Sequence, residues 1–353
     1  MKERIRSFDL IRVISAWIIV ICHFAEMVIG DPNFGYFPEF LFHHANGKWG
    51  ETTIVTVFFI LSGASLYYNH KEVTAKELPK FYWGRIKGLF PMFYIAWIVL
   101  YLENVMKYGS FAYLGSRKLL LLTITGMDGY LYDLFPGNYY IIGEWFLGAL
   151  VILYLLYPLM TWCMKHCRWI TTIVLSLLFL SLFFKSFIPL SNERNPFTCL
   201  LSFWAGMMFI EYRKQIMDQK WLTVVALVIG LIITFVTLPI PSLLCMQVLA
   251  VCIFLVLSRV GEPLMTIKPL ASFIGFGSKI SYGIFLLQHV MMSRVAHRFD
   301  GYGVGGIKLF GVLLLVFVVI YILAYLLLIV NKLVLKLPPV KWIDRWTDKI
   351  AKA

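Results

Sequence analysis

Long apolar stretches separated by shorter polar connections run through the whole chain. A transmembrane helix needs about 20 mostly apolar residues, and ten stretches approach that length. We therefore predict an all-α, polytopic membrane protein with about ten transmembrane helices. The predicted spans are residues 10–29, 52–68, 88–106, 142–162, 169–188, 197–211, 221–239, 242–259, 278–296 and 307–335.

Two connections, 30–51 and 107–141, are longer than the others and rich in Gly, Pro, Asp, Tyr and Phe. The second contains an apolar piece, Leu119 to Thr125, that is too short to span a membrane. The acidic and His side chains of these connections either meet a hydroxylated substrate or are solvated loop residues. They are Asp31, Glu39, His43, His44, Asp128 and Asp133.

The composition agrees with a membrane protein. The chain is 60% hydrophobic and 14% charged, with a mean hydropathy of +0.79, whereas soluble domains are about 45–50% apolar and about 25% charged. A net charge of +13 would suggest nucleic acid in a soluble domain. Here basic membrane-flanking loops explain it, and we expect no nucleic-acid partner.

The distribution of Lys and Arg predicts the orientation, because cytoplasmic loops carry an excess of these residues. With the N-terminus inside, the cytoplasmic segments hold far more Lys and Arg than the outer ones. Both termini are therefore predicted to be cytoplasmic, in a multi-pass protein of the cell (plasma or inner) membrane.

The chain divides into a transmembrane domain, residues 1–335, and a tail, residues 336–353. In the tail, basic residues alternate with apolar ones that fall near one helical face, which is typical of an interfacial amphipathic helix. We predict a cytoplasmic tail that lies on membrane lipid. The apolar residues are Trp342, Ile343, Trp346 and Ile350.

The six Cys residues indicate neither disulfides nor a metal. Four of them lie within apolar runs, so no disulfide framework is predicted. Cys163 and Cys167 flank a short stretch that lacks a second half with metal-ligand spacing. We predict no bound metal.

The first apolar stretch is unusual because it carries four ionisable residues, Asp9, Arg12, His23 and Glu26. On a helix, the eleven steps from Arg12 to His23 return to within roughly 20° of the same direction and rise about 16 Å. Asp9 and Glu26 fall on that side too. One polar stripe therefore runs from a basic group near one membrane surface to an imidazole about halfway across.

Two interpretations of this stripe are open. Arg12 could reach the membrane surface from the helix end while His23 packs, hydrogen-bonded, between helices. Alternatively the stripe marks a functional site, because ionisable groups inside a membrane are costly and usually face a protein interior or a wet cavity. The shared face favours the functional interpretation.

Five short motifs follow one another along the predicted spans. They are Asp9–Arg12 followed by ten residues and His23; Phe58–Gly63 (FFILSG); Phe81–Arg85 with Lys87, Leu89 and Pro91; Trp145–Leu147 with Tyr154 and Pro158; and Ser281–Leu286 with Gln288 and His289. In this order and spacing they resemble the integral-membrane acyltransferase 3 family. The resemblance covers nearly the whole transmembrane region.

The chain departs from the family pattern in three places. Gly88 stands where the family often has a second Arg before the third helix, with Lys87 adjacent. Leu150 stands at a frequent Glu position, and Gln288 at a frequent His position beside His289. These departures indicate a divergent branch.

The resemblance implies an O-acyltransferase of cell-surface carbohydrates that uses acetyl-CoA or another acyl-CoA as donor substrate, with no permanently bound cofactor. An acyl-CoA is polyanionic and cytosolic, so its phosphates need Arg or Lys near the inner surface. Arg12, Arg85 and Lys87 fall there in the predicted topology, and we predict that they bind the donor.

His23 is the predicted catalytic base, since an imidazole titrates near neutral pH and can take the proton of an acceptor hydroxyl. Glu26 could orient that imidazole or favour its protonated form. Ser62 could donate a hydrogen bond to an oxyanion near the acyl-CoA thioester. Alternatively Ser62 and Gly63 are small residues that permit close helix packing.

Together these features predict a membrane O-acyltransferase that moves an acyl group, acetyl by the resemblance, from cytosolic acyl-CoA to a carbohydrate hydroxyl. The acceptor is a cell-surface polysaccharide or its lipid-linked precursor. Two alternatives remain: a transporter or exporter that uses the polar stripe without chemistry, and a membrane partner of polysaccharide assembly with a degenerate site. The oligomeric state is left open.

Overall fold

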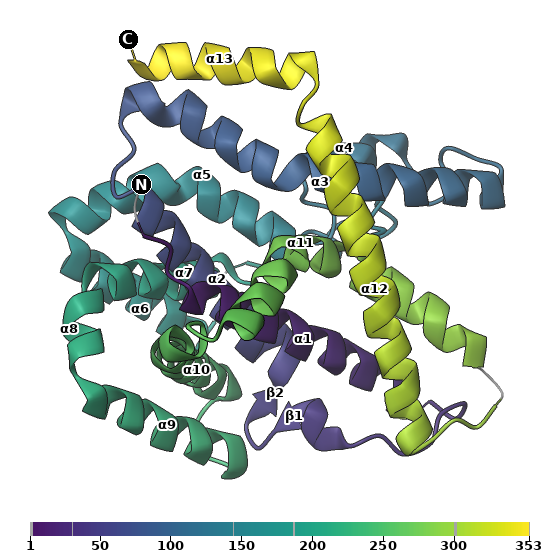
Figure 1. Cartoon of the computed structure of the whole chain (residues 1–353), viewed down its shortest axis with the longest axis horizontal. Coiled ribbons are helices and arrows are strands. Elements are labelled where there is room, and N and C mark those ends of the chain that lie inside the picture. Colours follow the sequence, from purple (N-terminus) through teal and green to yellow (C-terminus); the bar gives the residue numbers. More distant parts are fainter. Residues whose placement is uncertain (1–2, 30, 144, 186–187, 300–301, 353) are drawn as a thin grey trace. The chain divides into compact units, whose positions relative to one another are not determined.

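The computed structural model describes residues 3–29, 31–143, 145–185, 188–299 and 302–352. Helices make up most of this part of the chain (Figure 1). Their bounds are α1 Ser7–Val28, α2 Val55–Asn69, α3 Leu78–Tyr108, α4 Leu120–Ile124, α5 Trp145–His166, α6 Arg168–Ser181, α7 Pro196–Glu211, α8 Arg213–Asp218, α9 Lys220–Phe235, α10 Ser242–Leu264, α11 Lys268–Ala296, α12 Ile307–Val334 and α13 Pro338–Lys352.

Among the described residues, seven helices are long and apolar enough to cross a membrane. They are α1, Thr52–Asn69, α3, α5, α10, Lys268–Phe299 and α12. The all-α membrane class is thereby confirmed. The other three predicted spans coincide with the shorter apolar helices α6, α7 and α9, so a total of ten spans stays a prediction, as does the side on which the termini lie.

Two helices begin about ten residues before the spans predicted for them. α3 starts at Leu78 and α11 at Lys268, because hydropathy marks only the apolar part of a helix that continues through the polar interface. Before α3, Thr74 and Glu77 form a capping box, which satisfies backbone N–H groups that a helix start leaves unpaired.

The connection between α1 and α2 holds structure that hydropathy does not predict. Strands β1 (His43–His44) and β2 (Gly47–Lys48) form an antiparallel hairpin with His43 opposite Lys48. A π-helical turn over Trp49–Ile54 then leads into α2. The short apolar piece of the next long connection does form a helix, the five-residue α4.

The chain forms two compact units. The first contains residues 1–69, 172–281 and 291–319, and the second contains residues 70–171, 282–290 and 320–353. Helices α11 and α12 therefore contribute segments to both.

In the first unit α2 packs closely against α7, and α1 packs against α10 and α2. Gly63 of α2 and Gly206 of α7 make the close approach possible. A Cβ added to Gly63 would lie 1.9 Å from the Phe203 carbonyl oxygen, and one added to Gly206 would lie 1.9 Å from that of Ile60. Small residues let helix backbones approach in this way.

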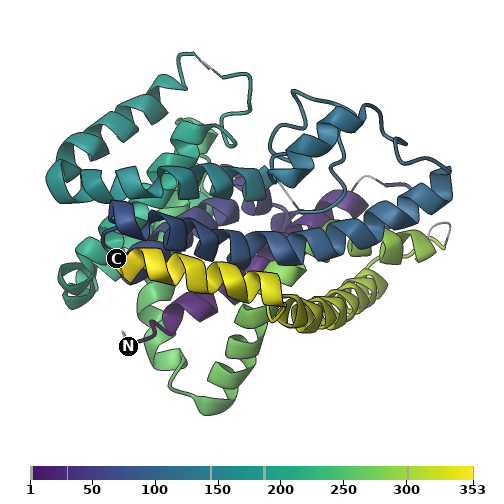
Figure 2. The ribbon, with the colours of Figure 1, turned by 90° about the horizontal axis from the view of Figure 1, so that it is seen from above.

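In the second unit α13 lies alongside the first part of α3, as the two views agree (Figures 1 and 2). Lys80 Nζ is 2.8 Å from Asp348 Oδ1, and Asp344 pairs with Lys87. The predicted tail is thus a helix that contacts α3. Its Trp342 side chain is exposed, as an interfacial helix requires, while its place at the membrane stays a prediction.

Candidate active site

The polar stripe of α1 ends in a His–Glu–Lys cluster within the first unit. His23 Nδ1 lies 3.5 Å from Glu26 Oε2, and Lys48 Nζ lies 3.4 Å from Glu26 Oε1. The His23 side chain is buried, whereas the side chains of Glu26 and Lys48 are each 38% exposed. The carboxylate therefore lies between a buried imidazole and an ammonium group.

This geometry favours one tautomer of His23. A carboxylate accepts hydrogen bonds, so Nδ1 carries the proton that faces Glu26. Nε2 is then the basic nitrogen, the atom that can take a proton from a hydroxyl. The predicted pairing of Glu26 with His23 agrees with this arrangement.

The hairpin and the π-helical turn cover this part of α1. A Cβ added to Gly50 would lie 2.7 Å from the Cys22 Cβ, so the turn packs directly on the helix. The Cys22 thiol also donates to the Leu41 carbonyl at 3.3 Å. These contacts hold the segment that presents Lys48 against α1.

His44 of the hairpin is neither a solvated loop residue nor exposed to an incoming substrate. It is buried, its Nε2 lies 3.1 Å from the Thr53 hydroxyl, and the Asn46 N–H donates to its Nδ1. Burial lowers the pKa of His44 to about 4. The neutral ring braces the hairpin against the π-helical turn, which corrects both interpretations offered by the sequence.

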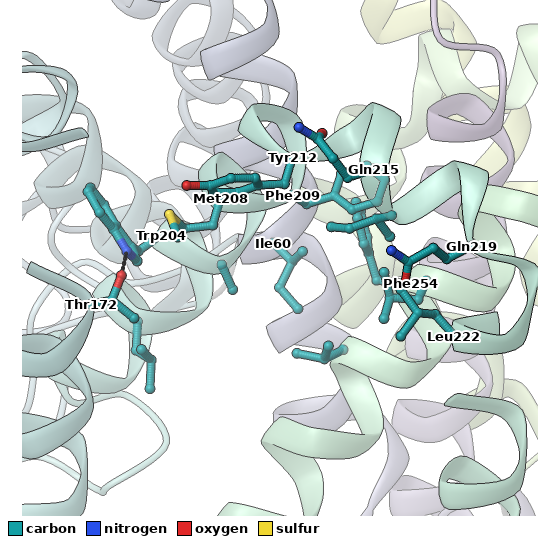
Figure 3. Close-up of a pocket in the computed structure, with 15 residues that line it drawn as sticks. Ile60, Thr172, Trp204, Met208, Phe209, Tyr212, Gln215, Gln219, Leu222 and Phe254 are labelled. Atoms are coloured by element: carbon teal, nitrogen blue, oxygen red, sulfur yellow. Dashed lines mark hydrogen bonds between the residues drawn. The ribbon is translucent and has the colours of Figure 1, made fainter. Parts of the chain in front are cut away.

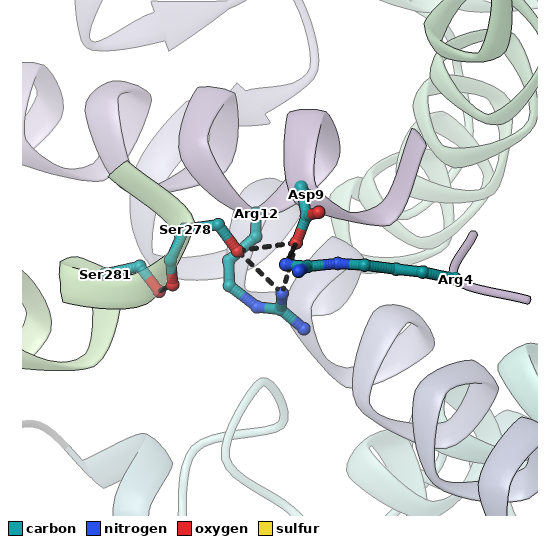
Figure 4. A network of polar contacts seen from close by, with 5 residues as sticks. All are labelled: Arg4, Asp9, Arg12, Ser278 and Ser281. Atoms are coloured by element: carbon teal, nitrogen blue, oxygen red, sulfur yellow. Dashed lines mark hydrogen bonds and ion pairs between the residues drawn. The ribbon is translucent and has the colours of Figure 1, made fainter. Parts of the chain in front are cut away.

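Arg12, at the other end of the stripe, belongs to a network around Asp9 (Figure 4). The buried Asp9 Oδ1 accepts from Arg4 at 2.8 Å, from the Ser278 hydroxyl at 2.7 Å and from Arg12 at 3.4 Å. Arg12 also donates to the Ser278 hydroxyl at 3.0 Å. Two guanidinium groups therefore share one carboxylate, which leaves an excess of positive charge.

Arg85 and Lys87 lie on α3 in the second unit, in different surroundings. The Arg85 guanidinium lies 5.7 Å from the ring centroids of both Phe81 and Tyr154, and its Nε is buried without a hydrogen-bond partner among the described residues. Lys87 pairs with Asp344, and this hydrogen bond lowers the pKa of Asp344.

The Ser62–Gly63 pair lies on α2. Gly63 meets the α7 backbone at close range, as the packing interpretation predicts. Ser62 is half-buried on the next position of the helix, and its predicted role toward an oxyanion stays a prediction.

In the fifth motif, on α11, Gln288 and not His289 points into the protein. His289 is exposed, whereas Gln288 is buried, and within the described part of the chain its Nε2 has no hydrogen-bond partner. The sequence leaves two alternatives for His289, a packed and satisfied side chain or a site residue, and its exposure contradicts the first. Gln288 also occupies the position where the family often has a His.

Three residues of these clusters escaped prediction: Lys48, Arg4 and Ser278. Lys48 lies in a connection with no periodic pattern, and Ser278 is 269 residues away from the Asp9 that it contacts. Arg4 precedes the first span, where a basic residue is explained by the membrane orientation alone. The first apolar stretch holds two carboxylates, Asp9 and Glu26, and one Arg. A search for further basic partners of these carboxylates would have brought Arg4 and Lys48 into consideration.

The fold and this polar site define a multi-pass membrane protein with ionisable groups inside its first helix. The family model for the acyltransferase domain of the acyltransferase 3 family matches residues 5–329. The chain belongs to that family and is a membrane acyltransferase. Comparisons with curated proteins and with solved structures found no match.

Proposed function

We propose that the protein transfers an acetyl group from cytosolic acetyl-CoA to a hydroxyl of a cell-surface polysaccharide or of its lipid-linked precursor. Family membership supports acyl transfer. The acetyl group, the CoA donor and the carbohydrate acceptor rest on the resemblance of the five motifs. A cell-membrane location follows from an acceptor that is assembled there.

The buried His23 beside Glu26 is the observation that carries the proposal. Nε2 of His23 takes the proton from the acceptor hydroxyl as its oxygen attacks the thioester carbonyl. Glu26 keeps the proton on Nδ1 and stabilises the imidazolium that forms, since its carboxylate is 3.5 Å away. Lys48 restrains the carboxylate from its other side. Collapse of the tetrahedral intermediate breaks the C–S bond, and the departing CoA thiolate takes the proton from Nε2 of His23, which restores the neutral imidazole.

The basic groups bind the polyanionic donor. Arg12 is fixed by Asp9 and Ser278, so its guanidinium is already oriented when a phosphate arrives. Preorganisation of this kind lowers the entropy cost of binding. The role of Arg85 and Lys87 in donor binding rests on their motif alone. The Ser62 hydroxyl is proposed to donate to the developing oxyanion.

The test supplies acetyl-labelled acetyl-CoA to membranes that contain the protein, together with native surface-glycan fractions. We expect label to enter an alkali-labile ester in the glycan. Palmitoyl-CoA and octanoyl-CoA in parallel define the acyl chain. Label in a lipid or protein fraction alone would refute the carbohydrate acceptor, and ester formation only from a longer acyl-CoA would refute acetyl as the group transferred.

A further inference from the structure

A cavity of about 550 Å³ lies within the first unit, away from the polar stripe, between α7, α8, α9 and α10 (Figure 3). One stripe of α7, continued by the residue that caps the helix, forms one wall of the cavity, with residues spaced four, three and four apart. Its members are Leu201, Ala205, Met208 and the C-cap residue Tyr212. A pocket of this size falls in the range that holds small-molecule ligands.

The pocket wall is apolar over most of its surface and polar at one end. Phe254 and Leu255 of α10 face the apolar part. The polar groups come from the segment around α8, where Gln215 and Gln219 line the rim. At the opposite wall the Trp204 indole donates to the Thr172 hydroxyl at 2.8 Å, so that polar pair is satisfied internally.

The polar end is positively charged. Lys214 and Lys220, the neighbours of the two rim glutamines, are exposed. Arg213 pairs with Glu262 at 3.3 Å. Over residues 211–220 together with Arg259 and Glu262, the four cations exceed the three anions Glu211, Asp218 and Glu262. An anionic group is therefore favoured at this end.

The helix beside this end carries the features of a membrane boundary. Trp221 and Val224 of α9 are 59% and 61% exposed, as expected for side chains in contact with lipid. An exposed Trp directly after Lys220 is typical of the level of lipid headgroups. This pattern predicts that the rim lies at headgroup depth and the apolar wall at the depth of the acyl chains.

We propose that this pocket binds one acyl chain of an anionic phospholipid, with the phosphate of the headgroup against Lys214 and Lys220. The carbon-rich wall takes the chain, and the basic segment selects the negative headgroup. The bound acyl chain contacts both α7 and α10 and thereby stabilises the first unit. This site is separate from the proposed acetyl-transfer chemistry.

The test uses the purified full chain, incubated with phosphatidylglycerol or phosphatidylcholine of equal chain length and examined by native mass spectrometry. We expect one retained phosphatidylglycerol in preference to phosphatidylcholine. The double variant Lys214→Gln/Lys220→Gln is expected to lower that preference by about fivefold for each Lys removed. Lys332→Gln/Lys336→Gln, which removes two exposed charges elsewhere, is the matched control and is expected to keep it.

A second variant tests the cavity itself. Ala205→Trp fills the pocket from α7 and is expected to lower retention of both lipids more than tenfold, with an unchanged thermal midpoint in lipid-free detergent. Leu255→Trp fills the pocket from α10. This variant is used instead if the Ala205→Trp protein does not fold. Equal retention of the two lipids by the native chain, or retention that ignores both Trp variants, would overturn the proposal. Preferential binding of palmitoyl-CoA, displaced by Ala205→Trp, would also overturn it and assign the pocket to a donor.

Discussion

His23 and Glu26 lie one helical turn apart on α1, with Nδ1 of the imidazole 3.5 Å from Oε2 of the carboxylate. The imidazole is buried and the carboxylate is partly exposed, where Lys48 restrains it. A buried imidazole oriented by a carboxylate suits general-base catalysis. In the proposed mechanism this pair is what activates the acceptor hydroxyl.

Replacement of Glu26 by Gln is expected to lower kcat about 10-fold to 100-fold, with little change in KM for acetyl-CoA. The amide oxygen can still accept from Nδ1, but the negative charge that stabilises the imidazolium is lost. Steady-state kinetics in membranes measure both constants. Glu39→Gln, which changes an exposed carboxylate in the connection after α1, is the control and should leave kcat unchanged. A rise in KM with unchanged kcat in Glu26→Gln would instead indicate a role in binding.

Asp9→Asn should destabilise the protein and weaken donor binding together. Asp9 is the carboxylate that Arg4 and Arg12 share in the network drawn in Figure 4, and loss of its charge removes both of these ion pairs. We expect a loss of about 1–3 kcal/mol of stability and a higher KM for acetyl-CoA. Thermal unfolding in detergent and donor titration measure these effects. Ser278→Ala keeps the ion pairs and should show a smaller change of the same sign.

Gly63→Ala should destabilise the protein by forcing α2 away from α7. The added methyl group would lie 1.9 Å from a backbone oxygen, which cannot move without its helix, so we expect a loss of about 1–3 kcal/mol or more. Gly88→Ala on α3 is the matched control, because no atom lies within 4 Å of its added Cβ. Ala also favours a helix over Gly by about 1 kcal/mol, so the control should be neutral or slightly stabilised. Equal thermal midpoints for the two variants would contradict the close packing of these helices.

Asp128, in the long connection of residues 107–141, should make stability fall as pH rises. It is buried, and burial raises its pKa to about 6, above the value of about 3.9 in an unfolded chain. The folded state therefore binds more protons between about pH 4 and pH 6, and its stability is lost as pH rises through that window. The difference corresponds to about 3 kcal/mol.

Asp128→Asn is expected to remove this pH dependence and to raise the thermal midpoint at pH 7. The Asn side chain is neutral at every pH in this range. Its amide oxygen can still accept the hydrogen bond that the Gly129 N–H donates to Asp128 Oδ1. Asp133→Asn, an exposed change in the same connection, should leave the dependence intact. The buried His44, whose pKa is lowered to about 4, contributes with the opposite sign in both proteins, so the difference between the native chain and Asp128→Asn is the quantity to compare. A difference in midpoint that stays constant between pH 4.5 and pH 6.5 would contradict the account.

Periodicity and hydropathy predicted the elements of this protein better than their contacts. The long apolar runs mark the cores of α1, α5 and α12, because a membrane demands apolar length. The pairing of His23 with Glu26 was predictable as well, since residues three apart on a helix are neighbours. Local rules of this kind need no knowledge of the fold.

Contacts across the chain were not predictable in the same way. Lys48 reaches Glu26 through a hairpin without hydrophobic alternation, and Ser278 reaches Asp9 across 269 residues. No pattern in a single sequence encodes such pairs. The inward turn of Gln288 instead of His289 depends on the rotation of α11, which a nearly continuous apolar run leaves undetermined.

The most direct test of the central claim compares His23→Gln with His166→Gln in membranes at equal expression. His166 is exposed at the end of α5, so its replacement controls for loss of a His. With labelled acetyl-CoA and the native glycan, the account predicts that His23→Gln lowers ester formation 100-fold to 10,000-fold, about the contribution of a general base. The His166 variant should keep the native rate. A folded His23→Gln protein that forms ester at the native rate would contradict the assignment of His23 as the base.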